Sequence, residues 1–307
     1  MQQINNFTEL LSHVQSLGTR IVAIANAQDQ AALSAFAEAK KMGFVQGIFF
    51  GDKQAIEEVL QSVAPELAGK VEIVHCPNEF EAVKSAVQAV HSHKADILLK
   101  GKVKTGRLLK MILDPEFGLR TGRLLSDALV FENPNRPANR LTIISDGGVT
   151  LKPDLKKKIE IIKNAVELAH ILGNPAPKVA LLSAVETVVP GLQSTADAAV
   201  IAKMNQRGQI RGCVIDGPLA LDNAVSPASL AMKKIESPVG GDADILIPPD
   251  IESANMLAKS TTYWAKYRLG HVIMGAGAPI LIPSRADTGD AKLLSIALGC
   301  IVCKLGE

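Results

Sequence analysis

Short aliphatic runs alternate with helical patterns along most of the 307-residue chain, and this alternation is the feature that most constrains the fold. Residues 20–25 predict a strand, the Ala-rich segment 29–41 predicts a helix, and residues 44–50 predict the next strand. The same pattern predicts further strands at residues 71–76, 96–99, 141–145, 179–183, 210–215, 245–247, 272–274 and 279–283. Strands that alternate with helices indicate an α/β fold, with parallel or mixed sheets and helices on both faces.

The alternation breaks between residues 126 and 139, a stretch that contains Pro134, Pro137 and three asparagines. A chain that crosses into a second domain there and returns later explains the break. We therefore expect a discontinuous first domain of residues 1–125 plus 272–307, and a second domain of residues 126–271. Aromatic residues make up 4% of the chain, so each core is expected to be aliphatic, which suits strands buried between helices.

The bulk charge gives no electrostatic reason to expect nucleic acid as a partner, because 33 basic and 31 acidic residues leave a net charge of +2. No window approaches the roughly 20 apolar residues of a membrane span, and residues 1–6 lack the basic start of a secretory signal. We therefore expect a cytoplasmic protein. Cys300 and Cys303 form a lone C-x-x-C inside an apolar run, so buried structural thiols are expected there rather than a metal or redox site.

The turns that lead from strands into helices are where ligands are expected, because open α/β sheets bind them beyond the carboxyl ends of their strands. Residues 100–107 form such a turn, with four cations, two glycines and one hydroxyl. Lys102 and Thr105, next to backbone amides at a helix N-terminus, are candidates for a phosphate cradle. The glycines have the spacing of a P-loop, but Arg107-Leu108 replace its Lys-[Ser/Thr] pair, which disfavours ATP or GTP. A solvated basic turn is the alternative.

A second turn, residues 283–290, connects the last strand to the last helix. Ser284 beside Arg285, at the positive end of that helix, suits binding of a phosphoryl group or an acyl phosphate. Asp287 or Asp290 could then act as a base, while Asp287 and Thr288 also have the chemistry of a helix cap, with Asp287 preferred for that role. Asp146, at the end of the 141–145 strand, is either a functional carboxylate near substrate or a residue that binds its own turn.

Taken together, these turns resemble the phosphate acetyl- and butyryltransferase family, from about residue 96 to the end of the chain. The Ser-Arg-Ala-Asp sequence at 284–287 is most similar to the butyryltransferase branch. The stretches that carry the resemblance are residues 144–146 with 152–153, 179–183 with Glu186, 216–218, 222–224, 237–241, 243–244, Pro248, Asn255, Lys259 and 284–285.

The resemblance implies two α/β domains of isocitrate-dehydrogenase-like architecture, an active site in the cleft between them, and homodimers or higher homo-oligomers. It also implies reversible transfer of a short acyl group, butyryl or acetyl, between coenzyme A and inorganic phosphate by direct attack of the thiolate. Coenzyme A is then a co-substrate, with neither a resident cofactor nor a metal required.

The family pattern implies catalytic roles for Ser284 and Arg285, with Asp290 preferred to Asp287 as the base because of its spacing. Arg107 and Arg120 are then the counterparts of further phosphate-binding arginines.

Two other readings stay open from the sequence. An NAD- and metal-dependent dehydrogenase of the same architecture, acting on a phosphorylated or carboxylated hydroxy compound, would need a cluster of carboxylates. Asp216, Asp222, Asp242 and Asp244 are close in sequence but lack recognisable ligand spacing. A binding protein for coenzyme A or phosphate that has lost its base is the third reading.

Overall fold

The computed structural model of the chain describes residues 3–284 and 287–303. The chain folds into two compact units, each assembled from segments far apart in sequence. Unit 1 consists of Met1–Phe7 and Leu124–Tyr267, and unit 2 consists of Thr8–Arg123 and Arg268–Glu307.

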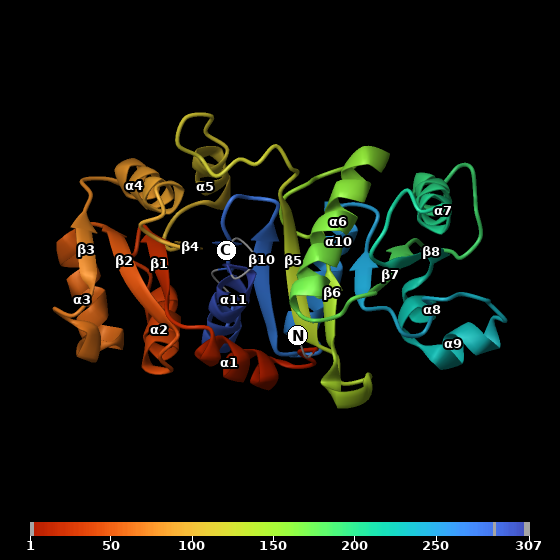
Figure 1. Cartoon of the computed structure of the whole chain (residues 1–307), viewed down its shortest axis with the longest axis horizontal. Helices are drawn as coiled ribbons and strands as arrows, with labels where there is room; N and C mark the ends of the chain where they lie inside the picture. The colour runs from red at the N-terminus through yellow and green to blue at the C-terminus, as the bar shows by residue number, and fades with distance from the viewer. Residues whose placement is uncertain (1–2, 285–286, 304–307) are drawn as a thin grey trace. The chain divides into compact units, whose positions relative to one another are not determined.

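Unit 2 is built on a mixed sheet with the strand order β3-β2-β1-β4-β11-β10 (Figure 1). Neighbouring strands run parallel, except that β10 is antiparallel to β11. The strands are β1 (Arg20–Ala25), β2 (Val45–Gly51), β3 (Glu72–His75), β4 (Ile97–Lys100), β10 (Leu269–Met274) and β11 (Ile280–Leu281). The parallel pairing places the carboxyl ends of β1, β4 and β11 at one edge of the sheet.

The helices of unit 2 pack in two groups, with α2 against α3 and α11, and α4 against α5. They are α1 (Phe7–Ser16), α2 (Gln30–Lys41), α3 (Lys53–Val63), α4 (Glu79–His91), α5 (Thr105–Ile112) and α11 (Gly289–Val302), with a 3₁₀ turn at Pro65–Leu67. Side chains of Asp29, Asp52 and Asn78 cap the N-termini of α2, α3 and α4 by accepting backbone N–H bonds. Helix α11 is buried along almost its whole length, as its apolar sequence predicts.

Unit 1 has a second mixed sheet, with the order β5-β6-β9-β7-β8. Its strands are β5 (Ser126–Glu132), β6 (Leu141–Ile144), β7 (Lys178–Leu182), β8 (Val214–Leu219) and β9 (Ile245–Ile247). β5 is antiparallel to β6, and the other pairs are parallel. Its helices are α6 (Leu155–Ile171), α7 (Gln193–Gln206), α8 (Leu221–Val225), α9 (Pro227–Met232) and α10 (Ile251–Tyr263), with a 3₁₀ turn at Pro137–Asn139.

An ion-pair network holds the amino ends of the unit 1 strands. The buried guanidinium of Arg136 donates to Asp242 (2.8 Å) and Asp244 (2.7 Å), which come just before β9. Lys178, at the start of β7, also pairs with Asp242 (3.1 Å). These charged side chains are paired with one another and lie at the edge opposite the carboxyl ends, where ligands usually bind. Their role is therefore structural.

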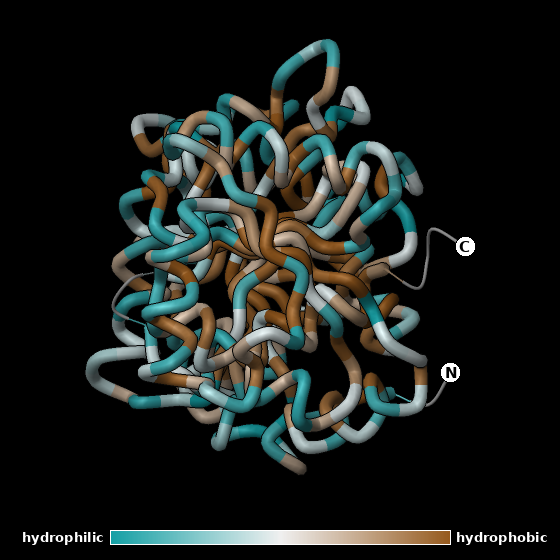
Figure 2. The backbone as a smooth tube through the Cα atoms, turned by 90° about the vertical axis from the view of Figure 1, so that its left-hand side faces the viewer, coloured by the Kyte–Doolittle hydropathy of each residue, from teal (hydrophilic) through white to brown (hydrophobic). Residues whose placement is uncertain are grey.

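The aliphatic cores match the composition: Figure 2 shows hydrophobic segments gathered inside the molecule, with hydrophilic segments in the outer loops. The predicted α/β class with mixed sheets is therefore confirmed. Two expectations about segments differ from the structure. The stretch 126–139 contains strand β5, and the strand predicted at 210–215 occupies Val214–Leu219 instead.

Two further observations concern the bulk predictions. Among the described residues, no helix combines the length and apolar character that crossing a membrane requires. All four cysteines are free thiols; Cys300 is buried as expected, whereas Cys303 is partly exposed.

Candidate functional site

The carboxyl edge of the unit 2 sheet brings two of the predicted turns together. Strand β4 lies between β1 and β11 and runs parallel to both. The basic turn after β4 and the segment after β11 that leads to Ser284 therefore leave the sheet from adjacent strands. In open α/β sheets this edge is the usual place for a ligand.

Close backbone contacts fix the turn after β4 against the end of β1. The N–H of Gly101 donates to the carbonyl of Ala25 (2.9 Å), and the N–H of Lys102 donates to the carbonyl of Asn26 (2.8 Å). The side-chain amide of Asn26 returns a bond to the carbonyl of Lys102 (2.6 Å). A Cβ atom on Gly101 would lie only 2.3 Å from the Asn26 carbonyl oxygen, so this approach requires glycine.

The cations of this turn have different environments. Lys102 and Lys104 are exposed, and Thr105 is the first residue of α5. Lys104 occupies the N-cap of α5 without a side-chain cap hydrogen bond, which leaves the first N–H groups of the helix for another acceptor. Lys100 is buried at the end of β4, and its ammonium donates to the carbonyl of Gly101 (3.4 Å). The sequence interpretation counted Lys100 among the cations but did not select it.

The first of the two predicted arginines, Arg107, ends this turn, and the second, Arg120, follows it along the chain. Arg107, on α5, pairs with Glu79 on α4 (2.6 Å), and its side chain is largely exposed. Arg120 is exposed, and its backbone forms an isolated antiparallel bridge with Ala276, beyond β10.

The segment that follows β11 is closed by Asp287. The N–H of Ser284 donates to Oδ2 of Asp287 (2.7 Å), and the N–H of Asp287 donates to the carbonyl of Ser284 (3.2 Å). Arg285 lies outside the described residues. Thr288 caps α11 by accepting the N–H of Ala291 (3.1 Å), so the prediction that Asp287 caps this helix is wrong: its carboxylate turns back to Ser284 instead.

Asp290 lies in the first turn of α11 with its carboxylate at the surface. Nε and Nη2 of Arg268 donate to its two oxygens, each over 3.2 Å. A two-point pair of this kind orients the carboxylate. Asp290 is thus held by a cation, whereas the Asp287 carboxylate is bound to backbone.

Asp146, in unit 1, is buried and binds its own turn. Oδ1 accepts the backbone N–H groups of Asp127, Gly148 and Val149 (3.0 Å each), and Oδ2 accepts that of Thr150 (2.8 Å). Burial, followed by the charge of Asp127, raises the pKa of Asp146 despite these bonds. The Asp146 carboxylate thus binds its own turn, and its predicted role near substrate stays a prediction.

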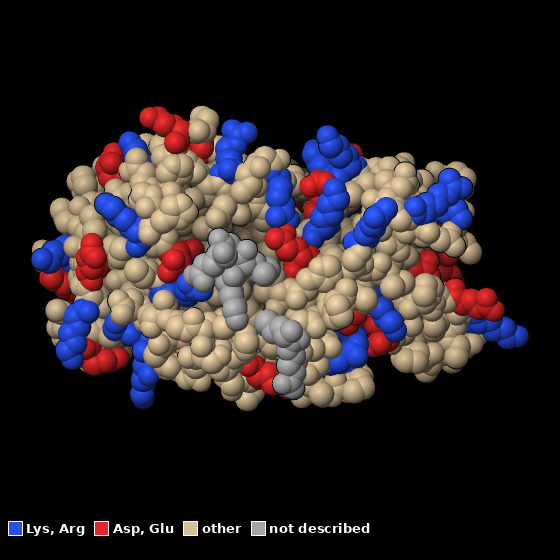
Figure 3. Space-filling view, viewed as in Figure 1, with Lys and Arg blue, Asp and Glu red and all other residues tan. Residues whose placement is uncertain are grey.

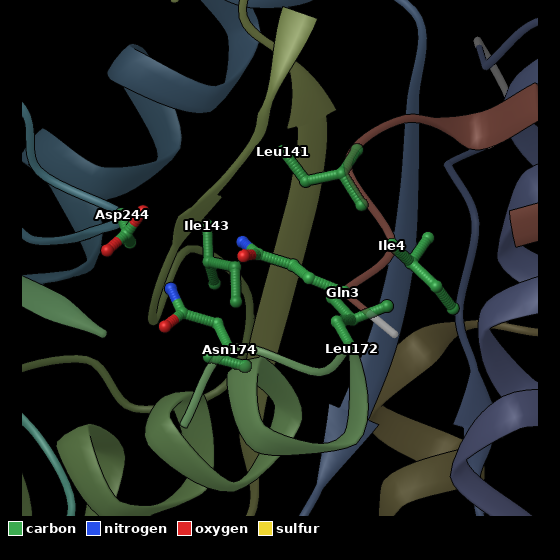
Figure 4. Close-up of a pocket in the computed structure, with 8 residues that line it drawn as sticks. Gln3, Ile4, Leu141, Ile143, Leu172, Asn174 and Asp244 are labelled. Carbon is green, nitrogen blue, oxygen red and sulfur yellow. The ribbon is translucent and has the colours of Figure 1, made fainter. Parts of the chain in front are cut away.

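Unit 1 has a pocket at the carboxyl ends of β7 and β9, and its lining includes a buried ion pair that the sequence interpretation missed. Lys158 on α6 donates to Asp197 on α7 over 2.7 Å. The helical spacing of the sequence could have predicted that Lys158 is buried. It lies three and four residues before Ile161 and Ile162, on the buried face of α6. Another pocket lies at the amino edge, where Leu141, Ile143 and Asp244 line it (Figure 4).

The carboxylates that a metal-dependent dehydrogenase would need are bound to other partners. Asp216 accepts the hydroxyl of Ser237, Asp222 pairs with Lys233 (3.3 Å), and the other two bind Arg136. In the part of the chain that the structure describes, no group of three His, Cys, Asp or Glu side chains could hold a metal ion. Figure 3 shows basic and acidic side chains interspersed over the face that it draws.

Comparison with known proteins favours acyl transfer. Residues 68–300 match the family model described as phosphate acetyl/butaryl transferase. The phosphate butyryltransferase of Clostridium beijerinckii is 43% identical over 97% of both chains. The phosphate acetyltransferase of Thermotoga maritima is 42% identical over 91% of this chain and 94% of that protein.

A solved structure, that of a branched-chain phosphotransacylase from Enterococcus faecalis, matches 93% of this chain and 99% of its own. The TM-score is 0.82 and the sequence identity is 31%. These matches do not favour the dehydrogenase reading and agree with the resemblance seen in the turns. The chain belongs to the phosphate acetyl/butaryl transferase family.

Proposed function

We propose that this protein reversibly transfers a short acyl group, butyryl or acetyl, between coenzyme A and inorganic phosphate. In one direction a phosphate oxygen attacks the thioester carbonyl, the C–S bond breaks, and the coenzyme A thiolate leaves and takes up a proton. In the other direction the thiolate attacks an acyl phosphate and phosphate leaves. The observation that carries the proposal is the family match, which includes both turns at the carboxyl edge of unit 2 up to residue 300.

The chemistry assigns roles to the second turn. A free thiol has a pKa of about 8.5, so it needs a base to attack at neutral pH. Asp290 is our candidate, because its carboxylate lies at the surface in the first turn of α11. Asp287 instead holds the turn through the N–H of Ser284. Ser284 and Arg285 would stabilise the anionic tetrahedral intermediate and the leaving phosphate, and loss of one such donor typically costs about 10²–10³ in rate.

The basic turn is the proposed phosphate-binding element. Lys102 and Thr105 lie at the N-terminus of α5, where backbone N–H groups and the helix dipole favour an anion. Arg107 pairs with Glu79 at the surface, and exposed pairs of this kind contribute little, so phosphate can displace Glu79. Arg120 is retained as a further phosphate ligand. Asp146 is proposed to shape its loop, since a carboxylate would repel phosphate.

Several features of the family pattern stay predictions for this chain. The first is that coenzyme A and phosphate are the only co-substrates and that no cofactor stays bound. The second is that the domains divide at residues 125/126 and 271/272, in an isocitrate-dehydrogenase-like architecture with an interdomain cleft. The last are a homodimer and a cytoplasmic location. The free state of all four cysteines fits a reducing compartment.

The reverse reaction gives a direct test. Acetyl phosphate or butyryl phosphate is supplied with coenzyme A, and loss of free thiol is compared with release of phosphate. We expect the two to be equimolar, and consumption of no thiol with either acyl phosphate contradicts the proposal. Asp290→Asn should lower kcat by about 10²–10⁴, the range of general base catalysis, and Asp287→Asn should lower it less.

A further inference from the structure

Lys292 is a buried cation without an acidic partner in the described structure. It is 3% exposed on α11. Its ammonium donates to the carbonyl oxygen of Asp287 over 2.7 Å. Within residues 3–284 and 287–303, that is its one polar contact, and no carboxylate lies within ion-pair distance. Lys158 provides the contrast: it is also buried, at 7% exposed, but Asp197 lies 2.7 Å from its ammonium.

A buried ammonium in this state is expensive to keep. It has three N–H donors, one of which is used, and its charge is removed from water without a compensating anion. Its place on the helix adds to the cost, because Lys292 lies in the first turn of α11, where the helix dipole disfavours a cation. An apolar side chain of similar length would fill the same space without this penalty. The arrangement therefore indicates an anion that balances the charge when the protein works.

The contacts of Lys292 lead to the turn at Ser284. The ammonium holds the carbonyl of Asp287, and the carboxylate of Asp287 holds the N–H of Ser284. Helix α11 packs on β4 and β11, the strands whose carboxyl ends carry the two candidate turns. Asp287 thus connects the unbalanced positive charge to the Ser284 end of the proposed phosphate site.

We propose that Lys292 is a positioning residue for the phosphate or phosphoryl group of the substrate. Its hydrogen bond to Asp287 fixes the turn at Ser284, and its charge is balanced by the substrate anion bound there. The inference rests on the proposed acyl transfer and adds to it a charged group that the sequence patterns did not identify.

The test separates the charge from the hydrogen bond. Lys292→Met removes both, Lys292→Gln keeps a donor without the charge, and Lys292→Arg keeps both. KM for phosphate and KM for acyl-CoA are measured separately for each variant. We expect Met and Gln to raise KM for phosphate about tenfold or more, the effect of losing a hydrogen bond to a charged group, with KM for acyl-CoA changed less than about threefold. Arg should restore most of the phosphate affinity.

Thermal unfolding provides a second readout that needs no turnover. Without phosphate, Lys292→Met should unfold at the wild-type temperature or higher, because a buried unpaired charge has been removed. Inorganic phosphate should raise the Tm of the wild type. It should raise the Tm of Lys292→Met and Lys292→Gln much less. Lys158→Met is the matched control: it leaves the buried Asp197 carboxylate without its cation, so it should lower Tm and leave the ratio of the two KM values unchanged.

The outcomes distinguish this inference from the proposed function. A wild type that turns over no acyl substrate overturns both. A wild type that is active, with Met and Gln variants that keep the wild-type KM for phosphate and the same Tm increase, overturns only the role of Lys292. A Gln variant as good as Arg also overturns it, because the hydrogen bond alone would then suffice.

Discussion

Replacing Gly101 by alanine tests whether the contact between β1 and the turn after β4 builds the site. The added Cβ would lie 2.3 Å from the carbonyl oxygen of Asn26 and 2.8 Å from that of Ala25, distances that real Cβ atoms essentially never show. Both obstacles are backbone atoms, so no side chain can rotate away. The turn would have to move, which strains the bonds from Gly101 to Ala25 and from Lys102 to Asn26.

The magnitude follows from two contributions. Overpacking a tight site costs about 1–3 kcal/mol, and each of the two strained hydrogen bonds contributes about 1 kcal/mol. We therefore expect Gly101→Ala to lower the free energy of unfolding by about 3–5 kcal/mol. Because Lys102 moves with the turn, KM for phosphate should also rise by about tenfold, the loss of one hydrogen bond to a charged group.

Gly106→Ala is the matched control in the same segment. No atom lies within 4 Å of its added Cβ, and the residue belongs to α5, where alanine is favoured over glycine by about 0.5–1 kcal/mol. Urea unfolding and phosphate-dependent release of coenzyme A thiol are measured for both variants. Equal stabilities and equal KM values for Gly101→Ala and Gly106→Ala would refute the reasoning.

Three further predictions concern the rest of the molecule. Arg136→Met removes the buried cation between Asp242 and Asp244 and should cost about 3 kcal/mol in urea unfolding; a loss below about 1 kcal/mol contradicts the network. Burial raises the pKa of Asp242, but Arg136 and Lys178 outweigh burial and hold the pKa below 3.8. The free energy of unfolding should therefore fall as the pH drops below about 4. In urea midpoints measured against pH, Arg136→Met should make this fall with pH less steep. Partial burial raises the pKa of Cys213 from 9.0 to about 11, so its alkylation near neutral pH should be at least about tenfold slower in the native than in the unfolded protein. Equal rates would contradict this effect of burial.

The sequence predicted elements well where local signals were unambiguous. The strands at 20–25 and 245–247 have the predicted bounds, because compact aliphatic runs stand between clear turn residues. Strand β5 was hidden because Pro134 and Pro137 follow it closely and made the whole stretch resemble a loop. Strand β8 was placed too early, since Gly217-Pro218 resembles a turn but lies within the strand.

The site was predictable at the level of turns but not of side-chain partners. Strand-to-helix turns at 100–107 and 283–290 follow from pattern and residue chemistry. Which of Asp287 and Thr288 caps α11 depends on backbone geometry near Ser284, which the sequence does not encode locally. The pair between Arg268 and Asp290 joins residues 22 positions apart, and the burial of Lys292 is a property of tertiary packing.

The phosphate dependence of thiol release from acyl-CoA tests the central claim most directly. Acetyl-CoA and butyryl-CoA are compared in parallel, with the wild type and with Arg285→Ala. The proposed acyl transfer predicts that phosphate triggers release of thiol and formation of acyl phosphate in equal amounts. It also predicts that Arg285→Ala lowers the rate by about 10²–10³. Thiol release that proceeds equally without phosphate, or no release with any acyl-CoA, would contradict it.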